Sequence, residues 1–125
     1  MPAPNDQEVA RYADLLAAIG AEPRLRIVRL LLAAHPKGMA AGDISAELDI
    51  TPSTLSHHLD RLKREDVVRV RREGTSLWYT VNTEALERLL RFLYAECCTR
   101  SGVIDPERLL SPSASTRSPR PGQEG

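Results

Sequence analysis

The sequence predicts a mainly α-helical domain that carries one β-hairpin, an α+β fold. Apolar residues recur at helical spacing in five segments of the chain. Two short runs, at 67–72 and 77–81, instead alternate and are rich in β-branched and aromatic residues, as strands are. A Gly-containing connector at 73–76 separates these runs, so we expect them to pair as a hairpin.

The first three helices are predicted from their apolar stripes and their ends. The first covers about 6–19 and ends at Gly20, and the second begins at Pro23, where a helix tolerates proline. The apolar stripe of the first comprises Val9, Tyr12, Leu15, Leu16 and Ile19. The second has a stripe that we expect to be buried: Leu25, Val28, Leu31 and Leu32. A short third helix at about 42–48 begins without a capping side chain, because Ala40 and Ala41 precede it.

The stretch DITPSTLSHHLDRLKRED, at 49–66, predicts a fourth helix with two distinct faces. Thr51 is a good N-cap, and proline follows it in the first turn. At 100° per residue, three leucines fall within about 60° of one another, with His58 beside them, and form an inward face. The opposite face is small, polar and able to hydrogen-bond, and its members are Ser53, His57, Asp60 and Arg64.

A fifth helix is expected to begin at Asn82 or Thr83, with one apolar stripe. The stripe comprises Leu86, Leu89, Leu90, Leu93 and Cys97. Beyond it the composition turns to Ser, Pro and Gly. We therefore expect one folded domain at 6–100 and a disordered Ser/Pro-rich tail at 101–125.

Composition narrows the range of functions. The 17 basic and 17 acidic residues of the 125-residue chain balance, but 23–38 holds basic residues and no acidic ones.

The chain contains no run of about 18 apolar residues and no secretory signal, so we expect no contact with a membrane. The only two cysteines are adjacent, which suits a reducing cytoplasm better than a disulfide framework. No Ser/His/Asp set, phosphate loop or Cys-x-x-Cys is apparent, and we do not expect an enzyme.

The order of these elements predicts a winged helix-turn-helix module. In such a module the second helix of the pair enters the major groove of DNA, and the hairpin contacts the adjacent backbone. Capping, outward polarity and the downstream hairpin favour this interpretation over a plain surface helix. A winged helix used for protein contact is the other alternative, and an exposed apolar groove in place of the basic face would favour it.

Three segments resemble the ArsR/SmtB family of metal- and metalloid-responsive transcriptional repressors: AEPRLRIVRLLL (21–32), TPSTLSHHLDRLKREDVVRVRREGTSLWYTV (51–81) and the leucine-rich last helix. The resemblance covers about 9–98. It implies a bacterial-type, nucleoid-associated homodimer, built largely from the first and last helices, on a palindromic double-stranded operator. It also implies an inducer that weakens DNA binding. The expected DNA contacts are Thr51, Ser53, Thr54, Ser56, His57, Arg61, Arg64, Arg71 and Arg72.

Cys97 and Cys98 are the candidate ligands of the inducer. The family's arsenite site near the recognition module uses a Cys-x-Cys pattern, and 38–48 contains no cysteine. Its zinc site on the last helix uses Asp and His, and 83–96 contains no histidine. Adjacent thiolates are soft ligands, whereas zinc needs four tetrahedral donors. Some arsenic-responsive relatives carry a comparable vicinal pair at the end of the last helix.

We therefore expect an As(III)- or Sb(III)-type inducer, such as arsenite, methylarsenite or antimonite, and no organic cofactor. Inorganic arsenite needs a third sulfur, from the other subunit or a small thiol, while methylarsenite needs only two. Redox or persulfide sensing by the same thiols stays an alternative, as do structural cysteines in a protein-interaction module. A disulfide between the neighbours is strained, because their Cα atoms lie about 3.8 Å apart, below the usual minimum of about 4.4 Å.

Overall fold

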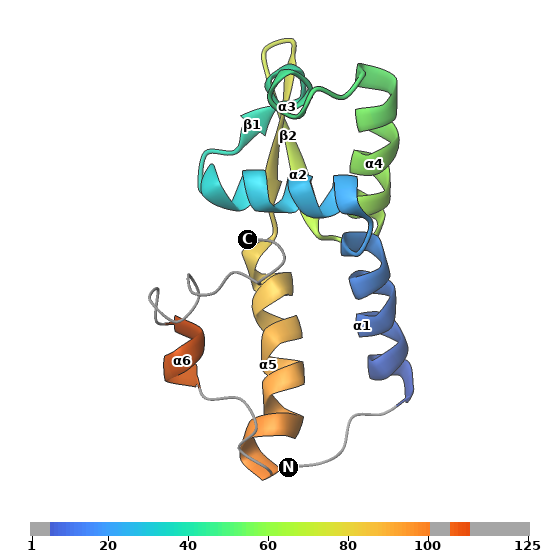
Figure 1. Ribbon diagram of the computed structural model, residues 1–125. Coiled ribbons are helices and arrows are strands. Elements are labelled where there is room, and N and C mark those ends of the chain that lie inside the picture. The colour runs from blue at the N-terminus through green and yellow to red at the C-terminus, as the bar shows by residue number, and fades with distance from the viewer. Residues whose placement is uncertain (1–5, 101–105, 111–125) are drawn as a thin grey trace, which may run out of the picture. The chain divides into compact units, whose positions relative to one another are not determined.

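The computed structural model describes the backbone of residues 6–100 and 106–110 and the side chains of 6–95 and 107–110 (Figure 1). The elements are α1 (Asp6–Ile19), α2 (Glu22–Ala33), β1 (Met39–Ala40), α3 (Ala41–Leu48), α4 (Pro52–Arg64), β2 (Val68–Glu73), β3 (Ser76–Val81), α5 (Thr83–Arg100) and α6 (Pro106–Leu110). The chain divides into two compact units, at 1–86 and 87–125. No helix in the described part of the chain is long and apolar enough to cross a membrane.

The three strands form one antiparallel sheet in the order β1-β3-β2. β2 and β3 make the predicted hairpin, with Val68 opposite Val81 and Glu73 opposite Ser76. The turn is shorter than the predicted connector, since only Gly74 and Thr75 lie outside the strands. The sequence did not predict β1, because two residues are too few to show an alternating pattern.

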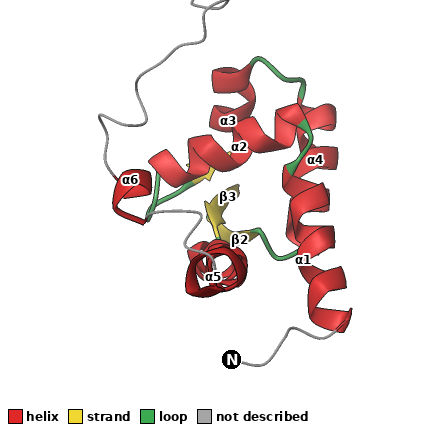
Figure 2. Ribbon diagram, turned by 60° about the horizontal axis from the view of Figure 1, so that its bottom comes forward, coloured by secondary structure: helices red, strands yellow, loops and turns green. Residues whose placement is uncertain are grey.

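The core of the first unit lies between the helices and one face of the sheet. In Figures 1 and 2, α2 crosses the sheet with its N-terminal end beside α4. The fully buried side chains of this core are Ile27, Leu31, Ile44, Leu55, Leu59, Leu62, Val67 and Val68. Three of them come from α4, so the fourth helix is anchored by its apolar face.

Two of the predicted apolar stripes are only partly buried. In α1, Tyr12, Leu15 and Ala18 are buried, while Val9 and Leu16 are exposed. In α2, Ile27, Val28 and Leu31 are buried, while Leu25 and Leu32 are exposed. The apolar residues of each helix extend round more than one face, and only the face toward neighbouring elements is covered.

The prediction of a tail without structure from residue 101 onward is wrong for its middle part. Residues 106–110 form α6, which begins at Pro106. Proline suits the first turn of a helix, and Leu109 and Leu110 are good helix formers. The rest of the predicted tail, at 101–105 and 111–125, lies outside the described residues.

Candidate nucleic-acid interface

The fourth helix is capped and anchored as its sequence predicts. Thr51 has an extended backbone, and its Oγ1 accepts a hydrogen bond from the backbone N–H of Thr54 at 3.4 Å. Asp49 ends α3 in a left-handed conformation, which turns the chain toward α4. The side chains of Leu55, Leu59 and Leu62 are at most 2% exposed. The opposite face of α4 is therefore fixed in its orientation by the core.

Of the predicted DNA-contacting side chains, Ser53, His57 and Arg64 lie on this outward face. Thr54, Ser56 and Arg61 flank it, and Thr51 is the N-cap. All are exposed except Arg61, which is half-buried: Thr51, Ser53, Thr54, Ser56, His57, Arg61 and Arg64. The ion pairs found among the described side chains involve neither Arg61 nor Arg64. The N-terminal end of α4 lies at the same end of this unit as α3 and the hairpin turn (Figure 1).

The hairpin contributes the two predicted basic residues of the wing. Arg71 and Arg72 are exposed on β2. The Nε of Arg71 lies 3.3 Å from Oε2 of Glu73. Both side chains of this ion pair are about half exposed, and such pairs contribute little to stability, so a phosphate can compete for Arg71.

The two histidines of α4 occupy different environments. His57 is exposed on the outward face, while His58 is half-buried against α2. Nη1 of Arg24 lies 3.4 Å from Nδ1 of His58, and Nε of Arg24 donates to the carbonyl of Ala18 at 2.5 Å. Burial, then the charge of Arg24 and then that of His57 lower the pKa of His58. Arg24 thus links α1, α2 and α4, and His58 serves this packing while His57 faces outward.

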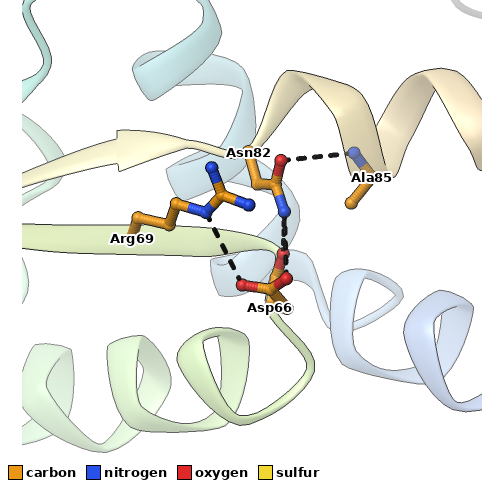
Figure 3. Close-up of polar contacts among 4 residues, drawn as sticks. All are labelled: Asp66, Arg69, Asn82 and Ala85. Atoms are coloured by element: carbon orange, nitrogen blue, oxygen red, sulfur yellow. Dashed lines mark hydrogen bonds and ion pairs between the residues drawn. The ribbon is translucent and has the colours of Figure 1, made fainter.

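Asn82 joins three elements through a buried polar contact (Figure 3). It is 2% exposed, and its Nδ2 donates to the carbonyl of Asp66 at 2.8 Å and to the carboxylate of Asp66 at 3.2 Å. Its Oδ1 accepts from the backbone N–H of Ala85 at 3.3 Å, in the first turn of α5. Asp66 lies in the turn between α4 and β2 and also pairs with Arg69 of β2 at 3.8 Å. The end of α4, the start of β2 and the start of α5 therefore meet at Asn82.

Sequence reasoning missed both linking residues. Arg24 lies in the segment 21–32, which resembles known repressors. A single sequence does not show that its side chain contacts His58, 34 residues later. Asn82 stands at the expected start of the last helix, where asparagine is a preferred cap. Its contact with Asp66 could not be predicted, because Asp66 lies 16 residues earlier and no local sequence pattern indicates the pairing.

Comparisons with known proteins agree with this geometry. Residues 19–71 match the family model of a helix-turn-helix domain. The transcriptional repressor SdpR of Bacillus subtilis is 31% identical over 80 residues, which are 64% of this chain and 86% of SdpR. The chain belongs to the ArsR-type family of helix-turn-helix transcriptional regulators.

Solved structures of the family show the same fold as this ArsR-type regulator. HlyU of Vibrio cholerae, named a transcriptional activator, is 29% identical over 93 residues, which are 74% of this chain and 83% of HlyU. Its structure superposes with a TM-score of 0.62 over 75% of this chain and 99% of HlyU. A homodimeric winged helix-turn-helix DNA-binding domain of Mycobacterium bovis is 27% identical, with a TM-score of 0.58 over 84% of this chain and 99% of that one. The relatives are transcriptional regulators, and this ArsR-type chain is likewise a regulator, not an enzyme.

The predicted sensor residues of this ArsR-type regulator lie in α5. The backbone places Cys97 and Cys98 at consecutive helical positions, and their side chains lie outside the described part. Among the described side chains, no group of three or more His, Cys, Asp or Glu could hold a metal ion. The metalloid site therefore stays a prediction.

Proposed function

We propose that this ArsR-type regulator is a repressor that binds a palindromic duplex operator as a homodimer. The observation that carries the proposal is the two-faced α4: three leucines fix the helix, and a capped, exposed polar face remains for the major groove. Short hydroxyl side chains, His57 and Arg64 can reach base edges and phosphates. Arg71 and Arg72 of the hairpin would contact the flanking backbone.

Exposed apolar side chains support the homodimer. In the first unit, α1 exposes Val9 and Leu16, with 48% and 44% of each side chain accessible. In the second unit, α5 exposes Leu90 and Leu93, with 65% and 45% accessible. Exposed apolar patches of this kind are typical of protein interfaces. The Mycobacterium bovis relative is itself described as homodimeric, and pairing two copies would cover these residues.

The inducer of the proposed repressor is a trivalent arsenic or antimony compound held by Cys97 and Cys98. Two adjacent thiolates match the preference of such soft, thiophilic centres. Consecutive helical positions diverge by about 100°, so one atom bonded to both sulfurs would distort the end of α5. Since α5 belongs to the proposed dimer interface, that distortion would change the separation of the two recognition helices. DNA fixes half-sites about 34 Å apart, so a changed separation weakens binding.

Redox sensing by the same thiols is the second candidate, and one comparison favours it. A structure of Vibrio cholerae HlyU in a form described as reduced is 29% identical to this chain, with a TM-score of 0.60. In this alternative Cys97 or Cys98 becomes oxidised or persulfidated in place of binding a metalloid. Intact mass spectrometry after peroxide, persulfide or methylarsenite treatment, run beside DNA-binding assays, assigns the species that releases DNA. Release by peroxide or persulfide alone would contradict the metalloid proposal.

The DNA-binding proposal is tested with a duplex selected from a random-sequence pool by the wild-type protein. We expect His57→Ala to weaken binding of the selected duplex by about 5- to 160-fold for each subunit bound, because one base-edge contact contributes about 1–3 kcal/mol. Binding of a scrambled duplex should change little, and sedimentation should give two chains per selected duplex. Fluorescence anisotropy of labelled DNA measures both affinities.

The matched control is Gln7→Ala, which also truncates an exposed polar side chain, on α1. It should leave both affinities unchanged. Selection that yields no preferred duplex, or equal loss on both duplexes for His57→Ala, would contradict base reading by α4.

A further inference from the structure

Trp78 on β3 carries two basic side chains over its ring. Nζ of Lys37 lies 5.2 Å from the ring centroid, and Cζ of Arg71 lies 5.5 Å from it. Arg71 is the direct cross-strand partner of Trp78 on β2, and Ala40 is its partner on β1. Distances of this size are typical of cation–π contacts. Residues far apart in the sequence thus place two positive charges at one aromatic ring.

The backbone before β1 holds Lys37 in this place. Gly38 follows it with φ of +85°, and a Cβ at Gly38 would lie 2.2 Å from the carbonyl oxygen of Tyr79. Only glycine allows the chain to pass this close to β3. The loop before β1 therefore packs closely against β3, and this packing places the ammonium group of Lys37 over the ring of Trp78.

The charges of this cluster remain available for an anion. Lys37 is exposed and takes part in none of the ion pairs formed by the described side chains. Arg71 has one acidic neighbour, Glu73, with 42% and 55% of the two side chains accessible. An exposed pair of this kind is screened by water and salt, so a doubly contacted phosphate can displace it.

We propose that Lys37 and Arg71, held in position by Trp78, bind a phosphate group of the DNA backbone beside the segment that α4 contacts. The inference rests on the proposed DNA-binding function and adds Lys37 as a contact residue and Trp78 as a positioning residue. One observation favours DNA over an acidic protein. The cluster lies on the same hairpin as Arg72, whose expected partner is the DNA backbone.

The ring makes the site more effective than two free side chains. Long basic side chains lose conformational freedom when they bind, and contact with Trp78 removes part of this freedom beforehand. The guanidinium of Arg71 offers a planar fork to phosphate oxygens, while the ammonium of Lys37 acts as a point charge.

The salt dependence of DNA binding tests the role of Lys37. Each phosphate contact contributes a slope of about −0.9 to the plot of log affinity against log salt. For Lys37→Gln we expect the slope to be shallower, by up to about 0.9 for each subunit bound because Arg71 still contacts the phosphate, and the affinity at about 0.1 M salt to fall several-fold. Lys37→Arg should keep the wild-type slope. Arg11→Gln, which removes one exposed charge from α1, is the matched control and should keep it too.

The role of Trp78 has a separate readout. Trp78→Leu keeps both charges, so affinity should fall while the salt slope stays near that of the wild type; Trp78→Phe should retain most of the affinity. Because Trp78 is the only tryptophan of the chain, its fluorescence should also change on binding a selected duplex. Far-UV circular dichroism and thermal unfolding verify that each variant is folded.

The outcomes separate this inference from the proposed function. If the wild type binds a selected duplex and Lys37→Gln keeps both its affinity and its slope, the phosphate site is wrong and the DNA-binding proposal stands. If Trp78→Leu binds DNA as the wild type does, the positioning role is wrong. If the wild type itself binds no duplex, the proposed function fails, and this inference fails with it.

Discussion

At the scale of single residues, two adjacent histidines show how position on a helix decides a role. His57 and His58 have the same side chain, but only His57 faces away from the core. His58 lies 3.4 Å from Arg24, whose other contact reaches the end of α1. Placing the sequence on a helical wheel predicts this division, because His58 falls beside the three leucines. The same wheel cannot predict Arg24, whose partner lies 34 residues away.

The environment of His58 predicts a pH dependence of stability. Burial and the charges of Arg24 and His57 hold its pKa below the ordinary value of 6.5. The folded protein therefore favours the neutral imidazole, and the unfolded chain takes up more protons as the pH falls through 6.5. This contribution to stability is complete above pH 6.5 and is lost as the pH falls toward the pKa of the folded state.

Urea unfolding at about pH 8 and about pH 5.5 measures this effect. The free energy of unfolding of the wild type should fall more between these two values than that of His58→Asn, which cannot titrate. His57→Asn removes only the last of the three causes, so it should stay closer to the wild type than His58→Asn does. Equal pH dependence in the wild type and His58→Asn would contradict the role given to Arg24 and His58.

At the scale of elements, the sequence predicts the helices and the hairpin well, because each carries a local signal. Thr51 and Pro52 mark the start of α4, and alternation marks β2 and β3. What local signals cannot show is which apolar face is covered. Leu25 and Leu32 have the periodicity of core residues and are exposed, since burial depends on neighbours that are distant in the chain. The polar outward face of α4 has the same local signal as α4 itself, whereas the Lys37–Trp78 contact depends on how the loop before β1 packs.

The contacts of Asn82 predict a loss of stability when it is replaced, because Asn82 connects the turn after α4 to the start of α5. Asn82→Ala removes the cap of α5 and leaves the carbonyl of Asp66 without its buried donor. We expect the free energy of unfolding to fall by about 1–3 kcal/mol. Denaturant unfolding measures this loss. Asn82→Ser, which keeps a capping oxygen and loses the amide donor, should lie between the wild type and Asn82→Ala. A loss below about 0.5 kcal/mol for Asn82→Ala would show that the three elements hold together without it.

At the scale of the whole molecule, α5 is the element shared by the two compact units. Its first turn belongs to the first unit, next to Asn82, and its remainder belongs to the second unit, with both cysteines. In the proposed mechanism the ligand acts at one end of this helix. Asn82 ties the other end to the turn that follows α4. A distortion that spreads along α5 would therefore reach the turn after α4 through Asn82, in addition to any change in dimer geometry.

The most direct test of this account is the release of a selected duplex by trivalent arsenicals. Fluorescence anisotropy of labelled DNA follows the titration of methylarsenite, arsenite or antimonite into the complex. At least one compound should release DNA from the wild type at stoichiometric concentration, and the variant with both Cys97→Ser and Cys98→Ser should bind DNA equally well and stay bound. A wild-type complex that none of the three compounds releases, or a doubly substituted complex that is released like the wild type, would contradict sensing by this cysteine pair.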